Sequence, residues 1–116
     1  MDDDAIHDLF AGFGRVTIKR MFGGKGIYHD GLVFALEVGG EILLKADAVS
    51  APDFAAAGSR QWVYKGQARA GPVAMPYWTI PDSAVDDAED VTQWARLAYE
   101  AALRSGRKAK PKKSRK

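Results

Sequence analysis

Apolar residues recur at helical spacing just after the N-terminus. Residues 6, 9, 10 and 13 are Ile, Leu, Phe and Phe, which stand at i, i+3, i+4 and i+7 and therefore share one face of a helix. The aspartates at positions 2 to 4 favour the positive end of a helix, and Gly14 can terminate it. The pattern predicts a first helix from about residue 4 to residue 13.

Two further helical patterns follow. Ser50 is a typical N-cap residue and Gly58 a typical terminator, so a short helix is predicted between them. A longer helix is predicted from about residue 86 to residue 105, with acidic residues at its start and Gly106 after its end. The apolar face of this long helix carries Val91, Trp94, Leu97, Ala98 and Ala101.

The segments between the helices are rich in β-branched and aromatic residues, which is typical of strands. We predict one long first strand that runs from "RVTIKRMF" through a glycine cluster to "IY", and further strands at 32–38, 41–46, 61–65 and 73–81. The segment 32–38 is apolar at both parities, with Leu32, Phe34, Leu36 and Val38 expected on one side and Val33 and Ala35 on the other. This strand is therefore predicted to be central and covered.

The order of these elements is α-β-β-β-α-β-β-α, and the short links between strands predict a mainly antiparallel sheet. The expected fold class is α+β, a two-layer sandwich of a five-stranded sheet with helices on one face. Pro76 cannot donate to a ladder, so the last strand is predicted to be an edge strand or to be bulged at that residue.

The stretch "RMFGGKG" at residues 20–26 raises the question of a phosphate-binding loop. Dinucleotide-binding loops and P-loops need other glycine spacings and a helix directly after the loop, whereas a strand follows here. The glycines are better explained as a bulge or sharp bend in the long first strand. An anion or ligand contact by Arg20 or Lys25 is the alternative.

The chain has 116 residues, which is enough for one domain, and it has no cysteine, which excludes disulfides, cysteine-bound metals and thiol nucleophiles. His7 and His29 are its two histidines, and both are expected to be solvated. We identify no catalytic constellation, metal site or cofactor site, no membrane span and no secretory signal. The chain is therefore expected to be a cytoplasmic protein and not an enzyme.

The charge is unevenly distributed. The whole chain has 17 Lys and Arg against 15 Asp and Glu, but the last ten residues hold seven of the cations and no acid, so residues 1–106 carry 10 cations against 15 acids, a net charge of −5. We predict a folded domain over 1–106 and a disordered basic tail over 107–116. The cations of the tail are Arg107, Lys108, Lys110, Lys112, Lys113, Arg115 and Lys116.

Such a tail is predicted to bind DNA or RNA non-specifically through counterion release. A solubilising extension, or one that contacts the acidic body of its own or another chain, explains it equally well. The aromatic residues allow a base-stacking platform, but at strand and helix spacing they more often fill a core or a dimer contact. These residues are Trp62, Tyr64, Tyr77, Trp78 and Trp94.

Taken in order, these segments resemble the N-terminal domain of the TfoX (Sxy) family. The most specific part is M-F-G-G-x-G-I-Y-x-D-G-L-x-F-A-L at residues 21–36, followed by the matches at 44–47 and at Tyr77-Trp78-x-x-Pro81. The likeness covers about residues 9–104, and here a basic tail stands where the regulators carry a second, C-terminal helical domain. The resemblance implies a secretion-chaperone-like α+β fold and a bacterial protein.

The resemblance also implies a role in regulating transcription and competence for DNA uptake, as a co-activator of the transcription machinery and not as an enzyme. Our leading hypothesis is a regulatory domain that binds a protein partner. The alternative is a homodimeric small-ligand or chaperone-like module that uses the exposed side of the sheet. Candidate partner or ligand contacts are Arg20, Lys25, Lys45, Tyr77 and Trp78.

Overall fold

The structure, a computed structural model, describes residues 1–21, 23–64 and 71–114, and for residues 107–114 it describes the backbone alone. Within these residues the chain forms three helices and six strands. In chain order they are α1 (Asp3–Leu9), β1 (Thr17–Met21), β2 (Gly24–His29), β3 (Leu32–Val38), β4 (Glu41–Lys45), α2 (Ala51–Ala56), β5 (Gln61–Tyr64), β6 (Val73–Thr79) and α3 (Ala88–Ser114).

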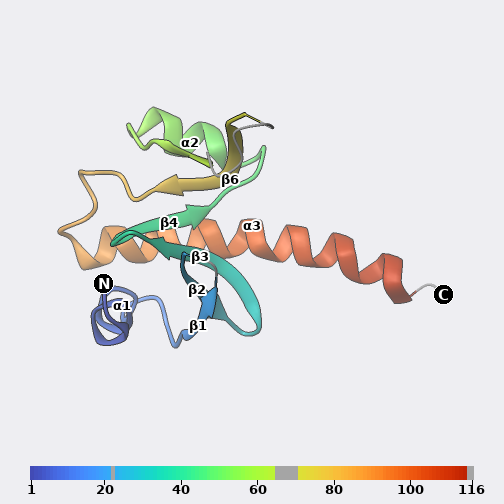
Figure 1. Cartoon of the computed structure of the whole chain (residues 1–116), viewed down its shortest axis with the longest axis horizontal. Coiled ribbons are helices and arrows are strands. Elements are labelled where there is room, and N and C mark those ends of the chain that lie inside the picture. The colour runs from blue at the N-terminus through green and yellow to red at the C-terminus, as the bar shows by residue number, and fades with distance from the viewer. Residues whose placement is uncertain (22, 65–70, 115–116) are drawn as a thin grey trace.

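The strands form one antiparallel sheet in the order β1-β2-β3-β4-β6-β5 (Figure 1). The predicted α+β class is confirmed, but the predicted count of five strands is wrong. The segment predicted as one long first strand is a hairpin, because Met21 pairs with Gly24 across the turn. Gly23 has φ +70 in this turn, a conformation that side chains other than glycine rarely adopt, and Phe22 lies outside the described residues.

A bulge in β3 redistributes its side chains between the two faces of the sheet. Ile27 pairs with Ala35 and Tyr28 with Val33, which leaves Phe34 as an extra residue between them. The side chains of Phe34 and Ala35 therefore both lie in the core on the helix side. Leu36 contributes to a second cluster on the other face, so the predicted grouping of Phe34 with Leu36 is wrong.

All three helices cover the same face of the sheet. In α1 and the turn after it, Phe10 packs edge-on against Phe34, with ring centroids 5.3 Å apart, and in α2 Phe54 packs against Trp94 of α3 at 4.8 Å. Helix α3 lies on the central strands β3 and β4. Figure 1 shows α3 crossing the sheet and extending beyond it at its C-terminal end. The expected two-layer arrangement is confirmed.

Helix α3 does not end at Gly106 as predicted. Gly106 is packed on the sheet, where an added Cβ would lie 3.1 Å from Cδ2 of Leu32, so this glycine permits close approach and the helix continues to Ser114. The lysines, arginine and alanine of this segment are good helix formers and cations suit the negative end of a helix, whereas Pro111 has no N–H to donate and disfavours a helix interior. The disordered tail over 107–116 stays a prediction: the structure describes the backbone of 107–114 as a continuation of α3, and Arg115 and Lys116 lie outside the described residues.

The shorter helices and β6 differ from the predictions in detail. Helix α1 ends at Leu9 and continues as turns, and the side chain of Ser50 does not cap α2. Strand β6 is internal and not an edge. Its pairing with β5 shifts register between Gln61 and Val63, which lie opposite the segment that contains Pro76, so the alternative of an irregularity there is confirmed.

None of the helices in the described part of the chain has the length and apolar character that a bilayer crossing requires.

Candidate functional site

The face of the sheet opposite the helices is the most extensive candidate surface, and we name it the open face. Strand register and alternation bring side chains from all six strands to it. In the described part of the chain no helix packs on it. Its members include Lys19, Met21, Tyr28, Val33, Leu36, Val38, Leu43, Lys45, Trp62, Tyr64, Met75 and Tyr77.

The centre of the open face is apolar. Leu36, Leu43 and Tyr77 form a cluster there, and they are buried by partly exposed neighbours that belong to the same face. These neighbours are Val33, Val38, Trp62 and Met75. The sheet thus has a second apolar surface, which its own side chains cover only in part.

Two lysines of the open face lie over tyrosine rings, Lys19 on the edge strand β1 and Lys45 on β4 within the apolar centre. Nζ of Lys19 is 4.9 Å from the ring centroid of Tyr28, and Nζ of Lys45 is 5.2 Å from that of Tyr77. Both distances are those of a cation–π contact. In the part of the chain that the structure describes, neither lysine has a carboxylate within ion-pair distance.

Partial burial changes the acid–base properties of one of these pairs. Desolvation lowers the pKa of Lys45, and the more distant charge of Asp47 only partly opposes this effect. Desolvation, with a smaller contribution from the Tyr28 phenol, raises the pKa of Tyr77. The ammonium of Lys45 is therefore held in surroundings that disfavour its charge.

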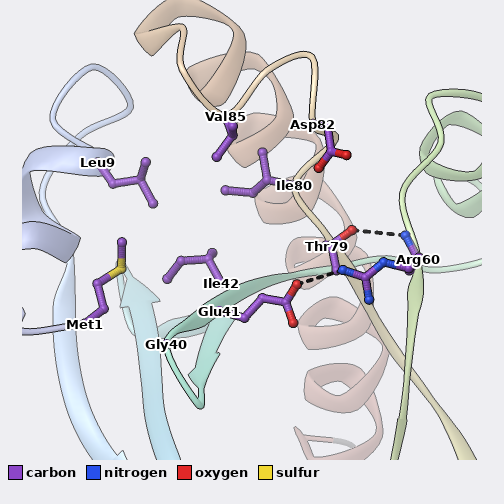
Figure 2. A pocket seen from close by; sticks show the side chains of 10 residues that line it. All are labelled: Met1, Leu9, Gly40, Glu41, Ile42, Arg60, Thr79, Ile80, Asp82 and Val85. Carbon is purple, nitrogen blue, oxygen red and sulfur yellow. Dashed lines mark hydrogen bonds and ion pairs between the residues drawn. The ribbon is translucent and has the colours of Figure 1, made fainter.

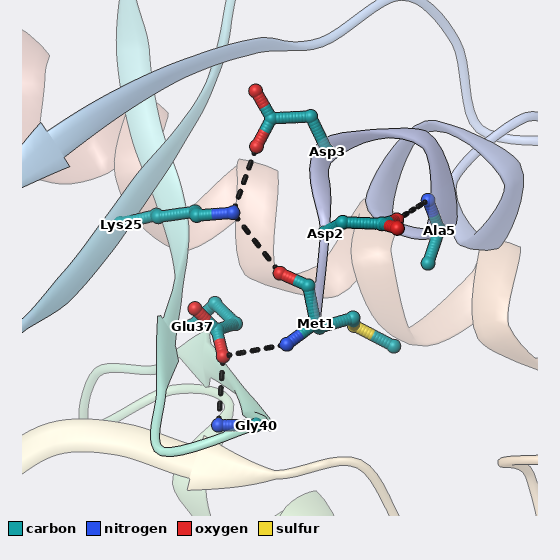
Figure 3. Close-up of polar contacts among 7 residues, drawn as sticks. All are labelled: Met1, Asp2, Asp3, Ala5, Lys25, Glu37 and Gly40. Atoms are coloured by element: carbon teal, nitrogen blue, oxygen red, sulfur yellow. Dashed lines mark hydrogen bonds and ion pairs between the residues drawn. The ribbon is translucent and has the colours of Figure 1, made fainter.

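Lys25 lies on the helix side of the sheet and is engaged within the molecule (Figure 3). Its Nζ donates to Oδ1 of Asp3 at 2.8 Å and to the carbonyl oxygen of Met1 at 3.0 Å. The hydrogen bond from Lys25, and at longer range the charge of Arg20, lower the pKa of Asp3. Arg20 is exposed and pairs in register with Lys25, so these two predicted contacts lie together, away from the open face.

A buried carboxylate lies beside Lys25 in Figure 3. Oε2 of Glu37 accepts from the backbone N–H of Gly40 at 2.7 Å and from the terminal amino group of Met1 at 3.4 Å. With these partners the charge of Glu37 is compensated inside the protein. This group holds the start of the chain against the β3–β4 hairpin.

The remaining predicted contacts separate. Lys45 and Tyr77 meet on the open face, whereas Trp78 lies on the helix side, where its ring stacks on Phe54 at 6.3 Å. Trp94 also packs on Phe54. Five of the tail cations belong to α3, where the structure describes their backbone alone. Arg115 and Lys116 fall outside the described residues. The five are Arg107, Lys108, Lys110, Lys112 and Lys113.

A cavity of about 200 Å³ lies at one end of the helix side, between α1 and the segment that follows β6 (Figure 2). Leu9, Ile42 and Ile80 give it an apolar lining. At its rim Arg60 pairs with Glu41 at 3.1 Å, and the backbone N–H of Arg60 donates to Oγ1 of Thr79 at 3.0 Å. Ligand pockets usually measure about 300–1,000 Å³, so this cavity is small for a metabolite.

His29 is not the solvated residue that the sequence predicts. Its ring packs against those of Phe13 and Tyr99, with centroids 4.8 and 4.9 Å away, and its Nδ1 is 2.7 Å from the carbonyl oxygen of Arg15. The side chain of His7 is exposed, as expected. Among the described residues no group of three or more His, Asp or Glu side chains is placed to hold a metal ion.

Sequence reasoning missed two members of the open face, Lys19 and Tyr28. The hairpin that brings β1 beside β2 places them together, and the prediction of one long strand removed that pairing. A signal was present, because adjacent glycines between two strand-like runs favour a hairpin turn, although Gly24 itself is the first residue of β2.

The family model described as TfoX N-terminal domain matches residues 8–102. A comparison with curated proteins finds no match to the chain.

Proposed function

The chain belongs to the TfoX N-terminal domain family, and on this basis we propose that it is a non-enzymatic regulatory domain that acts by binding a protein partner. The role we propose lies in the regulation of transcription or competence. The open face is the observation that supports it. Contiguous apolar patches of this kind on a soluble domain usually mark interaction sites.

Site-specific photo-crosslinking in an extract of the source cells tests this proposal. A photo-reactive phenylalanine analogue replaces Tyr64 or Met75 on the open face and, as the control, the exposed Gln93 on α3. We expect the same protein adduct from both open-face positions and not from position 93. Adducts at position 93 alone, or none at any position, would contradict the proposal.

We propose for the basic C-terminal residues a supporting role, non-specific affinity for DNA or RNA. Seven cations in ten residues favour this role, because each phosphate that they neutralise releases a counterion. Truncation after Gly106 should abolish salt-sensitive binding to a DNA duplex and leave the melting temperature nearly unchanged. Equal binding by the full and truncated chains at low salt would exclude the tail from this role.

A further inference from the structure

Charged groups near an apolar surface are normally paired with a group of opposite charge, and the two lysines of the open face are not. The ammonium groups of Lys19 and Lys45 contact tyrosine rings, and in the described part of the chain no carboxylate is within ion-pair distance of either. By contrast, Lys25 and Arg104 on the helix side are paired with aspartates. Arg15, Arg20 and Arg96 are likewise without an ion pair among the described residues, so Lys19 and Lys45 are distinguished by their place on the apolar open face and by their contacts with tyrosine rings.

The spacing of the two lysines suits a helix laid between them. Lys19 is on β1 and Lys45 is on β4, three strand intervals away, which corresponds to about 14 Å. A helix with its side chains is about 10–12 Å across. Leu36 on β3 lies between the strands of the two lysines, and Leu43 is two residues from Lys45 on β4. A helix laid over Leu36 and Leu43 would therefore have Lys19 at one flank and Lys45 beside Leu43.

We propose that the open face binds an acidic amphipathic helix of the protein partner, whose apolar side chains cover Leu36 and Leu43 and whose carboxylates pair with Lys19 and Lys45. The inference rests on the proposed function and names the chemistry of the partner. Pairing with a carboxylate would compensate the half-buried ammonium of Lys45. The partner helix would also complete a third layer, matching α3 on the opposite face.

Other occupants fit the open face less well. A second copy would bring lysines against lysines, because Glu41 already pairs with Arg60, and the basic C-terminal residues have the wrong sign. Single-stranded nucleic acid needs accessible rings for stacking. Tyr77 is only 8% exposed, and the one large aromatic ring of the open face among the exposed hydrophobic residues that the structure describes is that of Tyr64, on the edge strand β5.

Three probes and the full chain test the proposal. The first probe is an 18-residue helical peptide with a Leu and Phe stripe flanked by glutamates; the second has the same stripe flanked by lysines; the third is a 20-nucleotide oligothymidylate. Binding is followed by ¹⁵N–¹H chemical-shift perturbation in 50 mM salt. We expect the acidic peptide to bind at least ten-fold more tightly than the basic one and to shift β3, β4 and β6.

Charge-reversed variants identify the groups responsible. Lys19→Glu with Lys45→Glu should weaken binding of the acidic peptide at least ten-fold. If this variant folds poorly, Lys19→Gln with Lys45→Gln replaces it and should weaken binding by a smaller but measurable factor. Arg96→Glu, the same charge reversal made at one exposed site on α3, is the control and should change little. Equal binding of both peptides, preference for the oligothymidylate, or no effect of either double variant would overturn the proposal.

These outcomes are separable from those of the crosslinking experiment. A protein adduct at Tyr64 and Met75 together with indifference to peptide charge would retain the proposed function and reject the acidic helix. Failure of crosslinking with selective binding of the acidic peptide would retain the chemistry of the open face and reject the proposed role in the cell.

Discussion

The ion pair between Asp47 and Arg104 fixes the loop after β4 to helix α3. Nε of Arg104 donates to Oδ2 of Asp47 at 2.6 Å, and a second guanidinium nitrogen donates to Oδ1 at 2.9 Å. Oδ1 also accepts from the backbone N–H groups of Val49 and Ser50. The bond from Arg104 is the largest of the effects that lower the pKa of Asp47 to about 2. A bidentate pair of this kind has defined geometry as well as charge.

We expect Asp47→Asn to reduce stability at pH 7 by about 1 kcal/mol, because a partly exposed pair is screened by solvent and contributes much less than its pKa change suggests. The pKa of Asp47 is lower in the folded state, so its contribution is complete above the unfolded pKa and disappears as the pH falls from about 4 to about 2. Urea unfolding at pH 7 and pH 2 measures this. The wild type and Asp47→Asn should converge at pH 2, whereas Asp53→Asn, on the exposed side of α2, should track the wild type throughout.

At the scale of the element, the β1–β2 hairpin depends on a glycine that has no room for a side chain. A Cβ at Gly24 would overlap the carbonyl oxygen of Glu37 in the neighbouring strand. That oxygen belongs to the central ladder and cannot move without breaking the pairing of β2 with β3. The hairpin can therefore lie against β3 only if residue 24 is glycine.

Gly24→Ala is expected to destabilise the protein by about 2–3 kcal/mol, the upper range for overpacking. Gly106→Ala is the matched comparison, because its added methyl meets the movable end of Leu32, and helix propensity favours alanine there by about 1 kcal/mol. We expect the Gly106 variant to remain within about 1 kcal/mol of the wild type. Chemical denaturation measures the free energy of unfolding of both variants. If Gly24→Ala lost no more stability than Gly106→Ala, the backbone of β3 would have shifted to make room for the added methyl group.

The bulge in β3 depends on burial of its extra residue. Phe34 is fully buried, and its ring contacts those of Phe10 and Phe13. Phe34→Ala should cost about 3–5 kcal/mol, as large core truncations do. Val63→Ala, at a partly exposed strand position on β5, should cost less than about 1 kcal/mol. Thermal unfolding distinguishes the two, and a small loss at Phe34 would mean that the core closes over the cavity.

Local patterns predicted most of these elements but not the geometry that depends on neighbouring strands. The spacing of residues 6, 9 and 10 predicted α1, and the composition of residues 32–38 predicted β3. The bulge at Phe34 was not predictable in this way, because both parities of β3 are apolar and alternation carries no information there. Gly106 led to a wrong prediction of the end of α3. Glycine often terminates helices, but in this helix Gly106 allows close packing on Leu32.

At the scale of the whole molecule, acidic residues are kept away from the sheet. Of the 15 Asp and Glu residues, Glu37 and Glu41 are in strands, and both are engaged in ion pairs. Sequence reasoning predicted Lys45 and Tyr77 as candidate contacts but could not show that they share a face with Lys19. The net charge of residues 1–106 is negative, whereas the open face carries two lysines that have no carboxylate within ion-pair distance among the described residues. Folding, and not composition, creates that local difference.

This arrangement predicts how the protein behaves with copies of itself. An open apolar sheet face promotes self-association, and charged side chains at its margin oppose it. We expect Lys19→Met with Lys45→Met to form dimers or larger species at tens of micromolar, because the change removes charge while it keeps side-chain length. The wild type should remain monomeric under the same conditions.

Sedimentation velocity at 0.15 M salt measures this difference, with Arg96→Met as the control for adding one apolar side chain at an exposed site on α3. Raising the salt concentration should move the wild type toward the behaviour of the double variant, since screening weakens repulsion between the lysines of facing copies. If the wild type were already dimeric at low salt, the lysines would not prevent self-association through the open face. The open face would then be covered by a second copy, as the homodimeric alternative from the sequence requires.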